Sequence, residues 1–212
     1  PCNRDREHPI MSRALNLLLL GRMVEGRSVR PSATAPFSGV ARPASANAEA
    51  TPMPISTANF MDLVTQWASA NVNRIRLVWP LAGGWEAWAQ AEIAGHINAN
   101  VQDAWIEREA YVYPDRARAD FLVNNPFENP SSDEIVVEMK CESLRNWAGF
   151  IDGLRYDTWK LNGPMRLGLG GARKISLGLF FSPESEEQLA MLTGYEIRYT
   201  PHREIGIAFL VA

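Results

Sequence analysis

The sequence contains few of the side chains from which disulfide frameworks and soft-metal sites are built. It has two cysteines and three histidines in 212 residues. Cys2 lies at the end of the chain and Cys141 stands beside charged residues in a strand pattern, so we expect neither a disulfide framework nor a cysteine metal cluster. His8, His96 and His202 are too far apart in the sequence to indicate a histidine cluster. A reducing compartment, or indifference to redox state, follows.

Two further signatures are missing. No apolar run approaches the roughly 20 residues that cross a bilayer, so we expect no membrane span. The glycine-rich stretch RLGLGGARK, residues 166–174, lacks the spacing of dinucleotide-binding and phosphate-binding loops, and it leads into a strand. It is better explained as a loop between a helix and a strand. The net charge of −3 argues neither for nor against a nucleic-acid partner, because a local basic groove can bind phosphate on an acidic protein.

The chain divides into two parts by composition. Residues 1–56 carry seven arginines against four acids and include the stretch PSATAPFSGVARPASANAEATPMPIS. This stretch is rich in Pro, Ala and Ser and lacks the periodicity needed to bury a face, so it is predicted to be a linker. Residues 57–212 have the composition of one globular domain.

Residues 57–212 alternate between helical and strand patterns. Apolar side chains at helical spacing predict one helix around residues 60–67 and a second around 85–96. Three strand patterns follow, and the later segments predict a helix, a strand, a helix and two strands. Short turns make neighbouring strands antiparallel, whereas the helix after the third strand allows a parallel crossover. The expected fold class is therefore α/β, with a mixed central sheet flanked by helices. The three strand patterns cover residues 104–114, 117–125 and 134–141, and the later segments cover 144–161, 174–182, 183–194, 195–200 and 204–212.

The third strand carries the most unusual pattern in the chain, IVVEMKCES at residues 135–143. Glu138 and Lys140 share one strand face, although the chain has only three lysines. The third strand is expected near the centre of the sheet, where an unpartnered charge is costly. Asp120 lies on the preceding strand, and close carboxylates repel each other unless a proton or a cation intervenes. Because Mg²⁺ takes one or two carboxylates and fills its other positions with water and phosphate oxygens, the pattern indicates a Mg²⁺ site flanked by Lys140.

The second helix offers a further acid. With Trp85 as the origin and about 100° per residue, Glu92 falls on the apolar stripe between Trp88 and His96. Glu92 is therefore expected to be a third oxygen donor or an anchor for a metal-bound water, with a partly exposed acid at the edge of the stripe as the alternative. Glu86 falls at the margin of the stripe and is expected to be solvated.

These residues together resemble the PD-(D/E)XK nuclease superfamily, which has the restriction-endonuclease-like αβββαβ core. The resemblance covers residues 84 to about 182. Ala119 stands where the family has a proline before the aspartate, and Asp115, although preceded by a proline, falls in the turn before the strand. The resemblance implies metal-dependent hydrolysis of phosphodiesters, most often in DNA, with RNA as an alternative substrate. It implies Asp120 and Glu138 as ligands of Mg²⁺, with Mn²⁺ as a substitute, Glu92 as an auxiliary ligand, and Lys140 as the catalytic base.

The biological setting and the rival functions stay open. A catalytic module behind a linker resembles the nuclease domains of secreted bacterial toxins, which act in the cytoplasm of a target cell and travel with an immunity protein. A repair or restriction enzyme fits the same residues. The alternative from another class is a noncatalytic module that keeps the fold and binds nucleic acid or protein. A third explanation is an unrelated α/β binding protein in which the pattern arises by chance.

Overall fold

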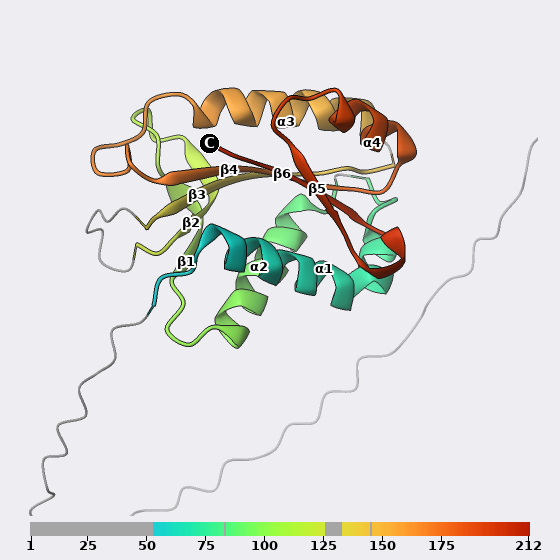
Figure 1. Ribbon diagram of the computed structural model, residues 1–212, viewed down its shortest axis with the longest axis horizontal. Coiled ribbons are helices and arrows are strands. Elements are labelled where there is room, and N and C mark those ends of the chain that lie inside the picture. Colours follow the sequence, from blue (N-terminus) through green and yellow to red (C-terminus); the bar gives the residue numbers. More distant parts are fainter. Residues whose placement is uncertain (1–52, 83, 126–132, 145) are drawn as a thin grey trace, which may run out of the picture. The chain divides into compact units, whose positions relative to one another are not determined.

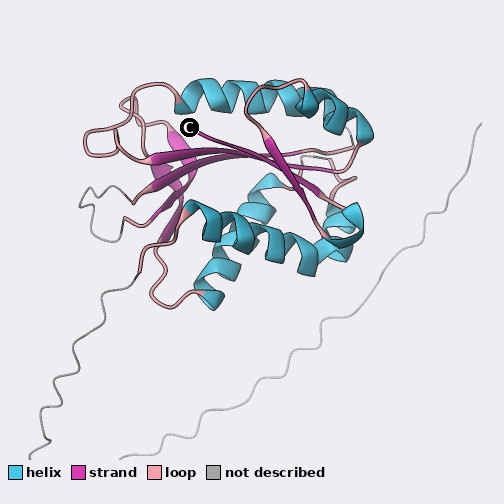
Figure 2. Cartoon of the chain, in the orientation of Figure 1, coloured by secondary structure: helices cyan, strands magenta, loops and turns pink. Residues whose placement is uncertain are grey.

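The computed structural model describes residues 53–82, 84–125, 133–144 and 146–212. Six strands form one mixed sheet with the order β1-β2-β3-β4-β6-β5. Helices α1 and α2 cover one face of this sheet, and α3 and α4 cover the other (Figures 1 and 2). The predicted fold class, α/β with a mixed central sheet flanked by helices, is confirmed.

The elements follow the predicted order along the chain. The helices are α1 (Thr57–Val78), α2 (Glu86–Asn100), α3 (Trp147–Leu161) and α4 (Pro183–Ala190), with a short 3₁₀ turn at Pro201–Arg203; the strands are β1 (Ile106–Tyr111), β2 (Arg118–Val123), β3 (Ile135–Cys141), β4 (Arg173–Phe180), β5 (Glu196–Tyr199) and β6 (Gly206–Val211). None of the described helices combines the length and the apolar character that crossing a bilayer requires.

Local sequence signals fix where two of the helices begin. The hydroxyl of Ser56 accepts a hydrogen bond from the Asn59 amide at 3.1 Å and caps α1. Ser182 caps α4 in the same way, and Pro183 occupies the first helical position, where its missing amide proton costs nothing.

The position of β3 follows from its connections. β2 and β3 are consecutive and antiparallel, whereas α3 carries the chain over one face so that β4 lies parallel to β3. This arrangement places β3 in the interior of the sheet, as predicted. Alternate β3 residues therefore face opposite helical layers. Val137 and Met139 pack in the apolar core with α1 and α2, and Glu138 and Lys140 face α3.

The domain begins before α1. The backbone of Ile55 exchanges two hydrogen bonds with the side chain of Asn124, at 2.9 and 2.8 Å, and the Ile55 side chain is buried. The residues just before α1 are thus held against the end of β2. The predicted linker and N-terminal extension lie almost entirely outside the described residues and stay predictions.

Close packing between β4 and β6 predicts the effect of one substitution. A methyl group at Gly206 would lie 2.1 Å from the ring of the buried Phe180. We expect Gly206→Ala to lower the free energy of unfolding by about 1–3 kcal/mol because the ring has to move. Gly95 is the control: a methyl group there meets nothing within 4 Å, and Ala favours the helix by about 0.5–1 kcal/mol. Urea denaturation measures both variants, and equal stabilities for them would contradict this packing.

Candidate functional site

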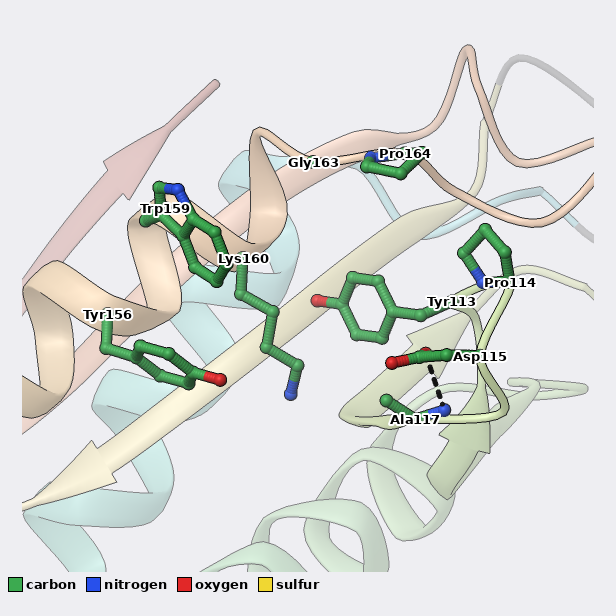
Figure 3. A pocket seen from close by; sticks show the side chains of 9 residues that line it. All are labelled: Tyr113, Pro114, Asp115, Ala117, Tyr156, Trp159, Lys160, Gly163 and Pro164. Carbon is green, nitrogen blue, oxygen red and sulfur yellow. Dashed lines mark hydrogen bonds between the residues drawn. The ribbon is translucent and has the colours of Figure 1, made fainter.

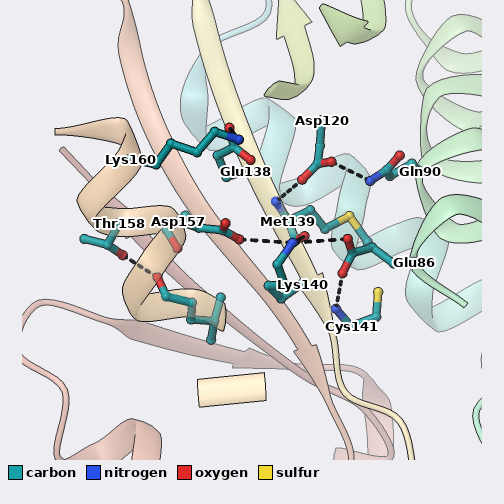
Figure 4. A network of polar contacts seen from close by, with 12 residues as sticks. Glu86, Gln90, Asp120, Glu138, Met139, Lys140, Cys141, Asp157, Thr158 and Lys160 are labelled. Carbon is teal, nitrogen blue, oxygen red and sulfur yellow. Dashed lines mark hydrogen bonds and ion pairs between the residues drawn. The ribbon is translucent and has the colours of Figure 1, made fainter. Parts of the chain in front are cut away.

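The candidate site forms where β2 and β3 separate. Their pairing ends at Phe121 and Val137, although β2 continues along β1 and β3 continues along β4. The amides of Met139 and Cys141, which would have faced a continuing β2, need other acceptors. Each finds a carboxylate. The gap between the strands is therefore lined by acidic side chains from two different elements (Figure 4).

Asp120 is held by both of its oxygens. Oδ2 accepts a hydrogen bond from the Met139 amide at 2.6 Å, and Oδ1 accepts one from Gln90 Nε2 at 2.7 Å. Arg108 of β1 donates to Gln90 Oε1 at 3.2 Å, which fixes the orientation of that amide. This chain of contacts from β1 through α2 to β2 holds the Asp120 carboxylate at the separation.

The backbone is unusual beside Asp120. Asp120 and Glu109 are opposite each other in the β1–β2 register, yet this pair is missing from an otherwise continuous ladder. Glu109 adopts a φ of 54°, a left-handed backbone conformation that residues other than glycine rarely take. Such local strain is kept only where surrounding contacts enforce it, and functional sites are frequent locations for it.

Lys140 lies between two carboxylates from opposite helical layers. Its Nζ lies 3.2 Å from Glu86 Oε1 of α2 and 3.3 Å from Asp157 Oδ2 of α3, and it donates to the Met139 carbonyl at 3.0 Å. The second oxygen of Glu86 accepts from the Cys141 amide at 3.2 Å. Glu86 thus accepts a hydrogen bond from the last residue of β3 and forms an ion pair with Lys140.

The structure corrects the expected placement of Glu92. Its two carboxylate oxygens pair with the guanidinium of Arg74 at 2.7 and 3.0 Å, on the side of α2 that meets α1. Glu92 therefore does not join Asp120, Glu138 and Lys140, and Glu86, expected to be solvated, takes the place beside them. The predicted stripe was centred on Trp85, but Trp85 is the N-cap and lies outside the helix, so its burial does not indicate which face of α2 is buried. The buried stripe of α2 instead consists of Ala89, Gln90, Ile93, Ala94 and Ile97.

The start of α2 is anchored firmly. The buried Trp85 indole donates to the Glu142 carbonyl at 2.7 Å, directly after β3. The Trp85 ring also packs against Phe181, with ring centroids 6.2 Å apart. Because Glu86 follows Trp85, this anchor holds the first turn of α2 against the end of β3.

Glu138 is almost completely buried, with 3% of its surface exposed. Its Oε1 accepts a hydrogen bond from the Tyr113 hydroxyl at 2.6 Å and lies 2.8 Å from Lys160 Nζ. Lys160 also donates to the Arg118 carbonyl at 2.9 Å and lies over the Tyr113 ring, 4.8 Å from its centroid. Within the described residues, only Oε1 of Glu138 has hydrogen-bond partners.

Burial dominates the electrostatics of this cluster. It raises the pKa of Asp120, against the hydrogen bond from the Met139 amide. Burial likewise raises the pKa of Glu138, although the contacts with Lys160 and Tyr113 lower it. It also raises the pKa of Glu86, although the positive charge of Lys140 lowers it. Burial alone would lower the pKa of Lys140, but the carboxylates around it raise the pKa above its usual range, so Lys140 is an ammonium at neutral pH.

The acids at the separation are oxygen donors of the kind that hard divalent cations take as ligands. Four acids (Glu86, Asp120, Glu138 and Asp157) face two lysines (Lys140 and Lys160). Each carboxylate oxygen can accept more than one contact, so the hydrogen bonds to Asp120 and Glu138 leave room for a ligand bond. Among the described residues, no group of three or more His, Cys, Asp or Glu side chains is arranged to hold a metal ion. Asp120 and Glu138 remain the pair that suits Mg²⁺, which binds through one or two carboxylates and keeps several waters.

The other sequence predictions have mixed outcomes. Asp115 is a turn residue as expected, since its Oδ1 accepts from the Ala117 amide two residues on, at 3.0 Å. Five contributors were not predicted: Glu86, Gln90, Arg108, Tyr113 and Asp157. The spacing of α2 contained a signal for Glu86, because Ile93 follows it by two turns and faces the sheet.

No protein-family model, curated protein or solved structure matches this chain. The resemblance to PD-(D/E)XK nucleases therefore rests on the residues and their arrangement alone. The expected DNA substrate, the metal, the immunity protein and the cellular location stay predictions.

Asp157 provides a pH test of this electrostatic description. It is 2% exposed, and burial raises its pKa from 3.8 to about 7. Because the folded-state pKa is above the unfolded value, the stability that this group contributes is complete below about pH 3.8 and is lost as pH rises through 7. The loss is on the order of 4 kcal/mol.

We expect Asp157→Asn to remove this dependence. The difference in unfolding free energy between the variant and the wild type should shift in favour of the variant from pH 5 to pH 8. Denaturation series at both pH values measure the change. A difference that stays constant across this range would show that Asp157 titrates normally.

Proposed function

We propose that this protein is a metal-dependent nuclease that hydrolyses phosphodiester bonds, with DNA as the substrate. The observation that carries the proposal is that Asp120, Lys140 and Glu86 surround the separation of β2 and β3, where Glu138 is the first β3 residue beyond the last pair. These residues come from two strands and a helix of an αβββαβ core, which is the order that the resemblance to PD-(D/E)XK nucleases implies.

In this proposal Asp120 and Glu138 hold Mg²⁺, and Glu86 takes the auxiliary position first expected for Glu92. A bound divalent ion in such a site acts as a Lewis acid toward a phosphate oxygen and lowers the pKa of a bound water. Gln90 and Arg108 hold the Asp120 carboxylate, and Tyr113 and Lys160 hold that of Glu138. These contacts keep the ligands in place before substrate arrives, as positioning of catalytic groups requires.

Lys140 serves as a fixed positive charge in this proposal. Hydrolysis adds water across a P–O bond, and negative charge builds on the phosphoryl oxygens as the attacking water loses its proton. An ammonium between Glu86 and Asp157 is already oriented and partly shielded from solvent, so it stabilises that charge without reorganising. The role of catalytic base implied by the family resemblance fits less well, because Lys140 is protonated in this arrangement.

One observation favours the noncatalytic alternative. Every lysine in the cluster is already paired with acids, Lys140 with Glu86 and Asp157, and Lys160 with Glu138. A closed network of this kind can simply hold α2 and α3 against β3. An activity assay separates the two functions.

Plasmid cleavage tests the proposal. We expect the protein to cut plasmid DNA with Mg²⁺ and not with EDTA, and we expect Asp120→Ala and Lys140→Ala each to lose at least tenfold in rate, since they remove a metal ligand and a stabilising charge. Absence of metal-dependent cleavage by the wild type would favour a binding module. Cleavage unchanged in both variants would place the active site elsewhere.

Two matched variants on α2 test whether Glu86, rather than Glu92, belongs to the site. Glu86→Gln and Glu92→Gln each remove one charge from an ion pair on the same helix. We expect the first to lower the cleavage rate about tenfold or more and the second to leave it unchanged, because only Glu86 reaches Lys140. Equal rates for the two variants would remove Glu86 from the site.

A further inference from the structure

An aromatic pocket lies beside the acidic cluster, and the two α3 rings that line it, Tyr156 and Trp159, take no part in the chemistry proposed above. It has a volume of about 370 Å³, within the range of small-ligand pockets. Tyr156 and Trp159 of α3 form one side, and the loop from Tyr113 to Asp115 lies across from them (Figure 3). Pro164 closes a third side.

The two aromatic side chains from α3 are unusually exposed. Tyr156 and Trp159 keep 60% and 69% of their surfaces in solvent, and their ring centroids are 5.5 Å apart. Large rings gathered in solvent beside a pocket are typical of binding surfaces. Their flat faces suit another planar ring, since stacking on aromatic side chains contributes about 1–3 kcal/mol per nucleic-acid base.

Two residues connect this pocket to the acidic cluster. Tyr113 and Lys160 both line the pocket, and both contact Oε1 of Glu138. The positive charge of Lys160 therefore lies between the aromatic rings and the candidate metal ligands. Lys160 Nζ also donates to the backbone carbonyl of Arg118 at 2.9 Å, which holds the ammonium beside the pocket. A planar group flanked by negative charge is the ligand that this combination complements.

We propose that the pocket binds an unpaired nucleobase of a single-stranded nucleic acid, with the adjoining phosphate on the Lys160 side. The inference rests on the proposed nuclease function and specifies its substrate: strands with an accessible base, in preference to uninterrupted duplex. A base stacked inside a duplex presents only its edges and cannot insert between Trp159 and the Tyr113 loop. The Asp115 carboxylate, on that loop, keeps phosphate away from its own side of the pocket and can accept a hydrogen bond from a base.

Binding measured in EDTA tests the pocket separately from cleavage. The probes are a fluorescein-labelled 12-nucleotide thymidine strand, the same strand annealed to its complement, and a strand of equal length with abasic sites throughout. Fluorescence anisotropy gives the Kd of each. We expect the wild type to bind the thymidine strand about tenfold more tightly than either of the others, since one stacked base accounts for roughly that factor.

Variants assign the preference to the pocket. Trp159→Ala should bind the thymidine strand as weakly as the wild type binds the abasic strand, and Trp159→Phe should restore most of the loss. Leu77→Ala, at an exposed apolar residue of α1 on the opposite face, should behave as the wild type. Equal affinity of the wild type for thymidine and abasic strands, or an unchanged Kd in Trp159→Ala, would overturn the inference.

The outcome is independent of the plasmid assay. Base-dependent binding without metal-dependent cleavage of either plasmid or single-stranded DNA would support the pocket and defeat the nuclease proposal. Cleavage of plasmid without base-dependent binding would do the reverse.

Discussion

The separation of β2 from β3 is the constraint on which the site depends. Beyond Phe121 and Val137 the two strands no longer pair, so the Met139 and Cys141 amides lose the acceptors that a continuous sheet would have supplied. Leaving a buried amide unpaired costs about 1–3 kcal/mol. Carboxylates from two elements, Asp120 on β2 and Glu86 on α2, fill both positions. The backbone of β3 therefore gathers acids that electrostatics alone would keep apart.

Carboxylates this close together repel each other, and the other charged residues of the site reduce that repulsion. Glu138 and Asp157 add two more carboxylates, and the lysines at 140 and 160 neutralise only part of the total. The remaining negative charge can be met by raised pKa values or by a cation. The proposed nuclease function follows from the second of these, and the ion pairs hold α2 and α3 in place around the strands. The aromatic pocket on α3 joins the same network through Lys160 and Tyr113.

The sequence was sufficient for the order of the elements and for the placement of Asp120, Glu138 and Lys140 on neighbouring strands, but not for the residues that α2 and α3 contribute. Asp120, Glu138 and Lys140 could be predicted because strand alternation and strand order determine which side chains share a face and which strands are neighbours. The rotation of a helix about its axis is set by packing. In α2, Trp88 lies at the edge of the buried face and packs against Trp67 and Arg74. Because Trp88 was counted as part of the apolar stripe, the predicted stripe was rotated toward Glu92. Asp157 and Lys160 depend in the same way on how α3 crosses the sheet.

Cation binding tests the central claim most directly. Thermal unfolding of EDTA-treated protein, titrated with Mg²⁺, measures whether the folded state binds the ion. The account predicts a saturable rise in Tm for the wild type and for Glu92→Gln, and no rise in Asp120→Asn relative to its own metal-free Tm. A wild-type Tm that does not respond to Mg²⁺, or an equal rise in Asp120→Asn, would contradict the account.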